Sequence, residues 1–90
     1  MSWAVCIAEI PAQAVLDLPP DLAKMSANFL RALAIEVGGA IDLGRKPPGD
    51  PMDEVGLRHS LEIPGEPVIV EYIILRELRE IRIAVLVWLG

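Results

Sequence analysis

The sequence has one clear candidate for acid–base chemistry, His59, and Arg58 stands directly before it. Histidine is the side chain that accepts and releases a proton near pH 7, and a guanidinium group can stabilise negative charge on a phosphate. Neighbours on a strand point to opposite faces, so the alternating pattern places His59 on an apolar face and Arg58 on a polar one. Both also have a structural alternative: His59 as a buried, hydrogen-bonded residue, and Arg58 in a surface ion pair with Glu62 or Glu71.

A second group of charges lies in a segment rich in proline and glycine. Arg45 and Lys46 form an adjacent pair of cations that could contact a small anion or a phosphate, and the alternative is a solvated loop. The carboxylates of Asp50, Asp53 and Glu54 follow, but no regular element fixes their positions, so no metal site is predicted. The sequence also lacks a phosphate-binding loop, a Ser-His-Asp order and a CxxC pattern, so no cofactor is predicted.

The size and the composition predict one small domain with an apolar contact surface. The 90 residues fit a single domain over residues 1–90, and 53% of them are hydrophobic. This excess indicates a packed core together with an apolar surface that meets a partner. The 13 acidic and 8 basic side chains give a net charge of −5, which argues against a general affinity for nucleic acid.

The single cysteine and the lengths of the apolar runs favour a cytoplasmic protein. Cys6 cannot form an internal disulfide, and we expect it to be a small buried thiol in a reducing compartment. The first ten residues lack the basic region and the long apolar run of a signal peptide. The longest apolar run, residues 83–89, is far too short to span a bilayer, so no membrane association is predicted.

The first half of the chain predicts a strand followed by two helices. Residues 2–10 begin with an apolar, partly β-branched run typical of a strand. Pro11 suits the first position of a short helix over residues 11–18, and Pro19-Pro20 must end it. A longer helix follows over residues 21–37, and Gly38-Gly39 is expected to end it. Its core stripe is predicted from residues three and four apart: Leu22, Met25, Phe29, Leu33 and Val37.

The last third of the chain predicts three antiparallel strands, over residues 57–63, 68–74 and 81–89. Pro64-Gly65-Glu66-Pro67 provides the first turn. The run 68–74 is nearly all apolar, as expected for a central strand covered on both faces. One long helix over residues 71–89 is the alternative. The fold class is therefore α+β, with an N-terminal strand and a two-helix hairpin packed on a small antiparallel sheet.

This order of elements, with Leu16-Asp17-Leu18-Pro19 between the helices and the apolar runs 68–74 and 81–87, resembles the RelE/ParE superfamily. These proteins are the toxins of type II toxin–antitoxin pairs. The resemblance spans nearly the whole chain and implies a cytoplasmic toxin that a cognate antitoxin neutralises. RelE-like members cut mRNA in the ribosome without a metal ion, and ParE-like members act on DNA gyrase. The resemblance thus implies either a metal-independent endoribonuclease or a gyrase-directed inhibitor of growth.

The resemblance also assigns candidate site residues. Arg58 stands at the basic position of the first C-terminal strand, so Arg58 and His59 are the candidate catalytic residues. The candidate RNA-binding residues are Arg45, Lys46 and Arg82. Pro67 occupies the place of an arginine that follows the glycine-containing turn in the RNA-cutting branch, and the chain ends Trp88-Leu89-Gly90 without a cation.

Two alternatives to a toxin remain open. The first is a non-enzymatic protein-interaction module, which would use a sheet edge or an apolar face to bind its partner. The second is a small domain that forms a homodimer, or a larger homo-oligomer, through the same apolar surface.

Overall fold

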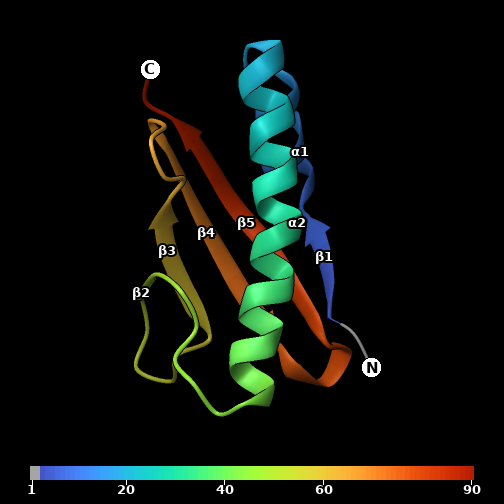
Figure 1. Cartoon of the computed structure of the whole chain (residues 1–90), viewed down its shortest axis with the longest axis vertical. Helices are drawn as coiled ribbons and strands as arrows, with labels where there is room; N and C mark the ends of the chain where they lie inside the picture. Colours follow the sequence, from blue (N-terminus) through green and yellow to red (C-terminus); the bar gives the residue numbers. More distant parts are fainter. Residues whose placement is uncertain (1–2) are drawn as a thin grey trace.

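The last third of the chain forms the middle of the sheet, as its alternating pattern predicts (Figure 1). The structure is a computed structural model that describes residues 3–90. Three strands are antiparallel neighbours in it: β3 (Arg58–Glu62), β4 (Val68–Leu75) and β5 (Glu80–Trp88). The predicted turn between β3 and β4 is confirmed, and a short 3-10 helix, η1 (Arg76–Leu78), joins β4 to β5.

One long helix over residues 71–89 is therefore wrong. Val and Ile residues fill both strands, and their branched side chains pack well on a pleated sheet. The chain reverses after η1 at Arg79, whose φ of +48° is a left-handed conformation. A further irregularity lies in β5, where Tyr72 pairs with Ile83 but Glu71 pairs with Val85, so that Ala84 is an extra residue.

Two short strands complete the sheet, in the order β1-β5-β4-β3-β2. β1 (Ala4–Ile7) runs parallel to the start of β5, and β2 (Asp50–Pro51) pairs with β3 inside the segment predicted to be a loop. The predicted antiparallel arrangement holds for β3, β4 and β5, but β1 joins the sheet as a parallel strand, so the sheet as a whole is mixed. Ser2, the first residue of the predicted N-terminal strand, lies outside the described residues.

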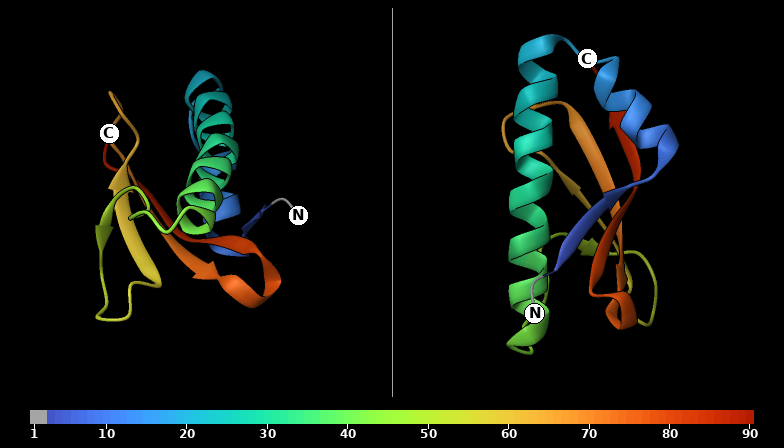
Figure 2. Two further views of the ribbon diagram at one scale, coloured as in Figure 1. Left: turned by 60° about the horizontal axis from the view of Figure 1, so that its bottom comes forward. Right: turned by 90° about the vertical axis from the view of Figure 1, so that its right-hand side faces the viewer.

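The two helices take different places beside the sheet (Figure 2). α1 (Glu9–Leu16) follows β1 and lies along the part of β5 that β1 does not reach, whereas α2 (Pro20–Asp42) crosses one face. In the left view of Figure 2, both helices lie on the same side of β3, β4 and β5. Within residues 3–90, no helix is long and apolar enough to cross a membrane.

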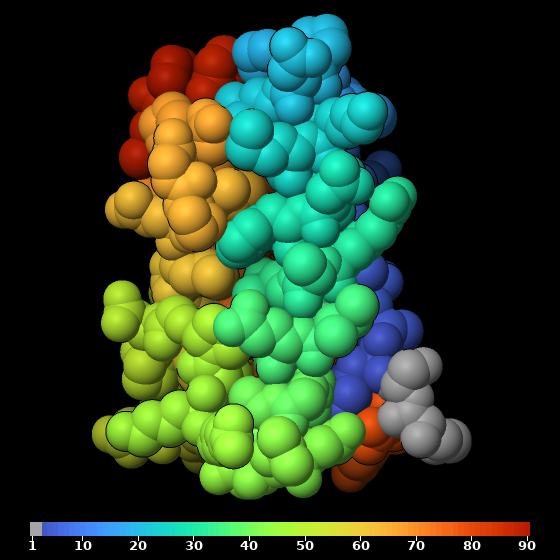
Figure 3. Space-filling model, in the orientation of Figure 1, coloured from blue at the N-terminus to red at the C-terminus, as the bar shows by residue number. Residues whose placement is uncertain are grey.

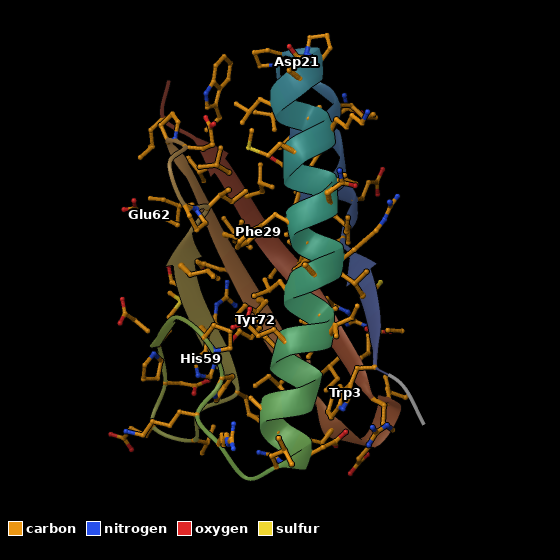
Figure 4. All side chains as sticks on the ribbon, in the orientation of Figure 1. Trp3, Asp21, Phe29, His59, Glu62 and Tyr72 are labelled. Atoms are coloured by element: carbon orange, nitrogen blue, oxygen red, sulfur yellow. The ribbon has the colours of Figure 1, made fainter. Side chains whose placement is uncertain are left out.

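The two glycines expected to end the longer helix lie inside it, because α2 continues to Asp42. At Gly38 the Trp3 ring rests against the helix, so a Cβ built there would overlap Trp3 Cδ1 (Figure 4). The indole Nε1 also donates a hydrogen bond of 3.2 Å to Asp42. Contacts between Trp3 and α2 therefore offset the low helix propensity of the glycine pair.

The predicted core stripe of α2 is correct in the second half of the helix. In the first half, the buried face of the helix lies to one side of the predicted residues. Leu33 and Val37 are buried, Leu22 and Phe29 are partly buried, and Met25 is 46% exposed. The residues of α2 that are buried against the sheet are Ser26, Leu30, Leu33, Ala34, Val37 and Gly38. The buried face of α2 thus includes small residues, Ser26, Ala34 and Gly38, which a prediction based on large apolar side chains leaves out.

The sheet is covered on one face only within residues 3–90. The side chains of Val68, Val70, Tyr72 and Ile74 on β4 are buried beneath the helix layer. The alternate residues of β4 point to the other face, here called the open face, so the prediction that β4 is covered on both faces is wrong for this chain. Cys6 is paired in register with Arg82 on that face and is exposed, which corrects the prediction of a buried thiol.

Candidate functional site

Arg58 and Arg82 lie together on the open face of the sheet. In the strand register, Ile73 of β4 stands between them, opposite Arg58 of β3 on one side and Arg82 of β5 on the other. Each guanidinium already has a carboxylate partner. Arg58 Nη2 lies 2.7 Å from Glu71 Oε1, and Arg82 Nη2 lies 2.8 Å from Glu80 Oε2. The predicted surface ion pair of Arg58 is confirmed, with Glu71 as the partner.

His59 faces the other way, as the alternation predicts. It is only 4% exposed and stacks on the Tyr72 ring, with centroids 5.3 Å apart and planes 8° apart (Figure 4). No hydrogen bond to its Nδ1 exists within the described residues. The prediction of a buried histidine is thus confirmed, whereas the hydrogen bond expected with it is absent at this nitrogen.

The surroundings of His59 favour a neutral imidazole. Burial lowers the pKa of His59 below its ordinary value of 6.5, and the negative charge of Asp53 opposes this effect in part. Burial also raises the pKa of Tyr72, so the phenol keeps its proton. A ring that is neutral at pH 7 can accept a proton, but this one is enclosed between the sheet and the loop that covers it.

The segment that covers His59 is the loop between α2 and β3. It is attached to the sheet by Tyr72, whose hydroxyl donates a hydrogen bond of 2.6 Å to the Pro48 carbonyl oxygen. Gly49 passes so close to β3 that a Cβ built there would lie 2.7 Å from the Ser60 carbonyl oxygen, and its φ is +95°. Figure 3 shows the loop, in yellow-green, filling the surface beside the lower end of α2.

Lys46 is the candidate cation that shares a site with His59. The two line a pocket of about 270 Å³, together with Pro47, Gly49, Pro51 and Gly56 of the loop. Arg45 does not line this pocket. It lies with Lys46 in a second depression, of about 400 Å³, formed against the end of α2 by residues such as Glu36 and Leu43.

The predicted catalytic pair is therefore not assembled. Arg58 lies on the open face with Arg82, and His59 lies on the helix side with Lys46, so the sheet separates the guanidinium groups from the imidazole. A phosphate placed against Arg58 would have no contact with His59. General acid–base catalysis needs the proton-transfer group within hydrogen-bond reach of the reacting atom, and this arrangement does not provide it.

The acidic residues of the loop do not form a metal site. Across residues 3–90, no group of three or more His, Cys, Asp and Glu side chains is close enough to hold a metal ion. Asp53 has a structural role instead, because its Oδ1 accepts a hydrogen bond of 2.9 Å from the Leu57 backbone N–H.

An apolar pocket at one end of the sheet is the feature that the sequence did not predict. It measures about 320 Å³, and Leu57, Leu75 and Leu78 supply much of its lining, together with Ile74, Arg76 and Glu77. Leu78 is 66% exposed and Leu57 is 38% exposed. We call these three leucines the leucine pocket. The high apolar fraction of the sequence signals such a surface, but its location depends on how β3 and η1 meet.

Comparisons with protein-family models, curated proteins and solved structures find no significant match to this chain.

Proposed function

We propose that this chain is a RelE/ParE-like member of a type II toxin–antitoxin pair, and that it acts by binding proteins rather than by cutting RNA. The element order supports the family proposal: strand, short helix, long helix, irregular loop and three antiparallel strands follow one another in that order. A cytoplasmic location and a cognate antitoxin as partner belong to the same proposal.

The observation that carries the choice of binding over cleavage is the separation of Arg58 from His59 by the sheet. RNA cleavage needs a proton-transfer group and charge-stabilising cations around a single phosphate. Both open-face arginines are also engaged by carboxylates of this chain, Glu71 and Glu80. A gyrase-like target, which is acted on by binding, therefore fits this chain better than ribosomal mRNA.

The leucine pocket is a suitable contact for such a partner. Protein interfaces are organised around a few apolar anchors that fill pockets and are surrounded by polar groups. Here Leu57, Leu75 and Leu78 provide the apolar lining, and Arg76 and Glu77 provide charged groups beside it. A partner that inserts an aliphatic side chain into this pocket would bury side chains that are now exposed to water.

The test is expression of the chain in a bacterial host, alone and together with the product of its neighbouring gene. We expect growth arrest with the chain alone, relief by the neighbour, and a complex of the two that purifies together. Arg58→Ala and His59→Phe should leave the growth arrest intact, whereas Leu78→Asp should weaken it or weaken the complex. Ile10→Asp is the matched control, because Ile10 is an exposed apolar residue on α1, away from the leucine pocket.

Other results would redirect the proposal. The absence of both growth arrest and a complex would reject it. A complex without growth arrest would identify a protein-interaction module that lacks toxicity. If Arg58→Ala and His59→Phe each abolished growth arrest while the variants stayed folded, RNA cleavage would replace binding as the mode of action.

A further inference from the structure

The open face of the sheet is more apolar than a strand face in water usually is. Strands with one face in water alternate between apolar and polar residues. On β4 the open-face positions hold Ile69, Glu71, Ile73 and Leu75, so three of the four are apolar. β5 adds Val85 and Val87 on the same face, because they pair with Glu71 and Ile69.

Four of these apolar residues form one patch in the middle of the sheet, and the fifth, Leu75, belongs to the leucine pocket. We call Ile69, Ile73, Val85 and Val87 the open-face patch. Val87 is 43% exposed, and the other three are half-buried by their neighbours alone. Within residues 3–90, no helix crosses this face, as the left view of Figure 2 shows. The patch therefore keeps branched apolar side chains in contact with water.

The charges around the patch indicate what covers it. The open face carries two arginines and four carboxylates, Arg58, Arg82, Asp50, Glu62, Glu71 and Glu80, which sum to −2. The whole chain has a charge of −5, so the rest of the chain holds −3. Two ion pairs within the chain already bind both arginines and two of the glutamates. This face thus offers little attraction to a polyanion or to a strongly basic partner, and a second copy of itself would meet little repulsion.

We propose that the open face is a self-association surface, on which the sheets of two copies of this chain pack face to face about a two-fold axis. Such an interface is isologous, so each open-face patch packs against the patch of the other copy. β-Branched side chains from two sheets can interdigitate in this way to form a dry layer. The inference does not depend on the proposed toxin function, because it rests on the strand pattern and the charges of the open face.

The size of the sheet sets the strength of this dimer. Five strands spaced about 4.8 Å apart span about 19 Å, and the eight residues of β4 extend for about 27 Å. Two such faces bury at most roughly 1,000 Å², which is below the standard size of about 1,200–2,000 Å² and typical of weak interfaces. The dimer should therefore dissociate in the micromolar range, and dilution should reveal both states.

Sedimentation velocity of the purified chain over about 1 to about 200 µM tests the proposal directly. We expect a monomer at the lowest concentration and a dimer at the highest. Ile73→Glu, in the centre of the patch, should raise the dimer dissociation constant by at least about 30-fold. Val87→Lys should do the same from a more exposed position, so the test remains valid if Ile73→Glu fails to fold. Circular dichroism establishes which variants are folded.

The control is Leu43→Glu, since Leu43 is an exposed apolar residue beside the end of α2 and not on the open face. This variant should dimerise like the parent chain. A parent chain that stays monomeric at about 200 µM would overturn the proposal and leave the patch to a partner of another kind. A dimer that both patch variants leave intact would overturn it too, because the interface would then lie elsewhere.

Discussion

His59 is a buried titratable residue, and it should make the stability of the protein depend on pH. Burial lowers its pKa in the folded state below the ordinary value of 6.5. Well above pH 6.5 the imidazole is neutral in both the folded and the unfolded chain, so its titration does not change the free energy of unfolding. As the pH falls below 6.5, the unfolded chain takes up a proton that the folded chain does not, so the free energy of unfolding decreases.

His59→Phe isolates this effect, because phenylalanine keeps a ring against Tyr72 but cannot titrate. Urea unfolding should be measured for both proteins at several pH values between 7.5 and 5. We expect the parent chain to lose more stability than His59→Phe as the pH decreases, while the carboxylates contribute equally to both. Parallel pH profiles would contradict the prediction and would indicate that the histidine is freely hydrated in the folded state.

The predictions from sequence for single residues succeeded where local alternation decides the outcome. Arg58 and His59 point to opposite faces of β3, and Arg58 pairs with Glu71, because side chains on a strand alternate whatever the rest of the fold does. The burial of Cys6 could not be predicted in this way. Its exposure depends on whether a further layer covers the open face, and that is a property of the assembled sheet.

The neighbouring glycines of α2 should respond to substitution in opposite directions. A Cβ at Gly38 would overlap the Trp3 ring, so Gly38→Ala must displace the indole and should cost about 1–3 kcal/mol. A Cβ at Gly39 meets no atom within 4 Å, so Gly39→Ala should stabilise the helix by about 0.5–1 kcal/mol. Thermal or urea unfolding of both variants measures the two changes against the same parent.

The pair serves as its own control, since both changes add one methyl group to adjacent positions of one helix. A stabilising Gly38→Ala would show that the Trp3 ring does not rest on α2 in solution. The fluorescence of Trp3 gives an independent reading, although Trp88 contributes a background to it. We expect a spectral shift in Gly38→Ala and none in Gly39→Ala.

Helices and strands were predicted well where one period of apolar residues runs through a segment. They were predicted less well where contacts with distant residues determine the structure. Val- and Ile-rich runs gave β4 and β5 to within about one residue. A Gly-Gly pair ordinarily ends a helix, but Trp3 and Asp42 hold α2 past it. The two residues of β2 have no strand signal of their own, and they pair with β3 only because the loop returns to cover His59.

For the whole molecule, the α+β class was predicted from the sequence, but the geometry of the candidate site was not. The parallel pairing of β1 with β5 joins the two ends of the chain, and no local pattern encodes that choice. The candidate cations were identified by charge alone. Which of them lie together depends on the face that each residue occupies and on where the loop folds. Arg82 lies with Arg58 on the open face, and Lys46 lies with His59 in the pocket under the loop.

The distribution of charge leads to a prediction about RNA. The chain has a net charge of −5, and both open-face arginines are paired with its own carboxylates. Phosphate binding depends on cations that are free to replace counterions. The folded chain should therefore show no binding to a labelled single-stranded RNA, measured by fluorescence anisotropy at about 100 µM protein and about 50 mM salt.

The double variant Glu71→Gln, Glu80→Gln tests the cause of this behaviour. It removes both partner carboxylates, frees Arg58 and Arg82 on one face, and changes the net charge from −5 to −3. We expect a measurable affinity for RNA that decreases with added salt, because two cations now face the same phosphates. If the parent chain itself bound RNA, and Arg45→Ala with Lys46→Ala removed that binding, the loop cations would be an RNA site. That result would show that the ion pairs of Arg58 and Arg82 do not prevent the protein from binding RNA.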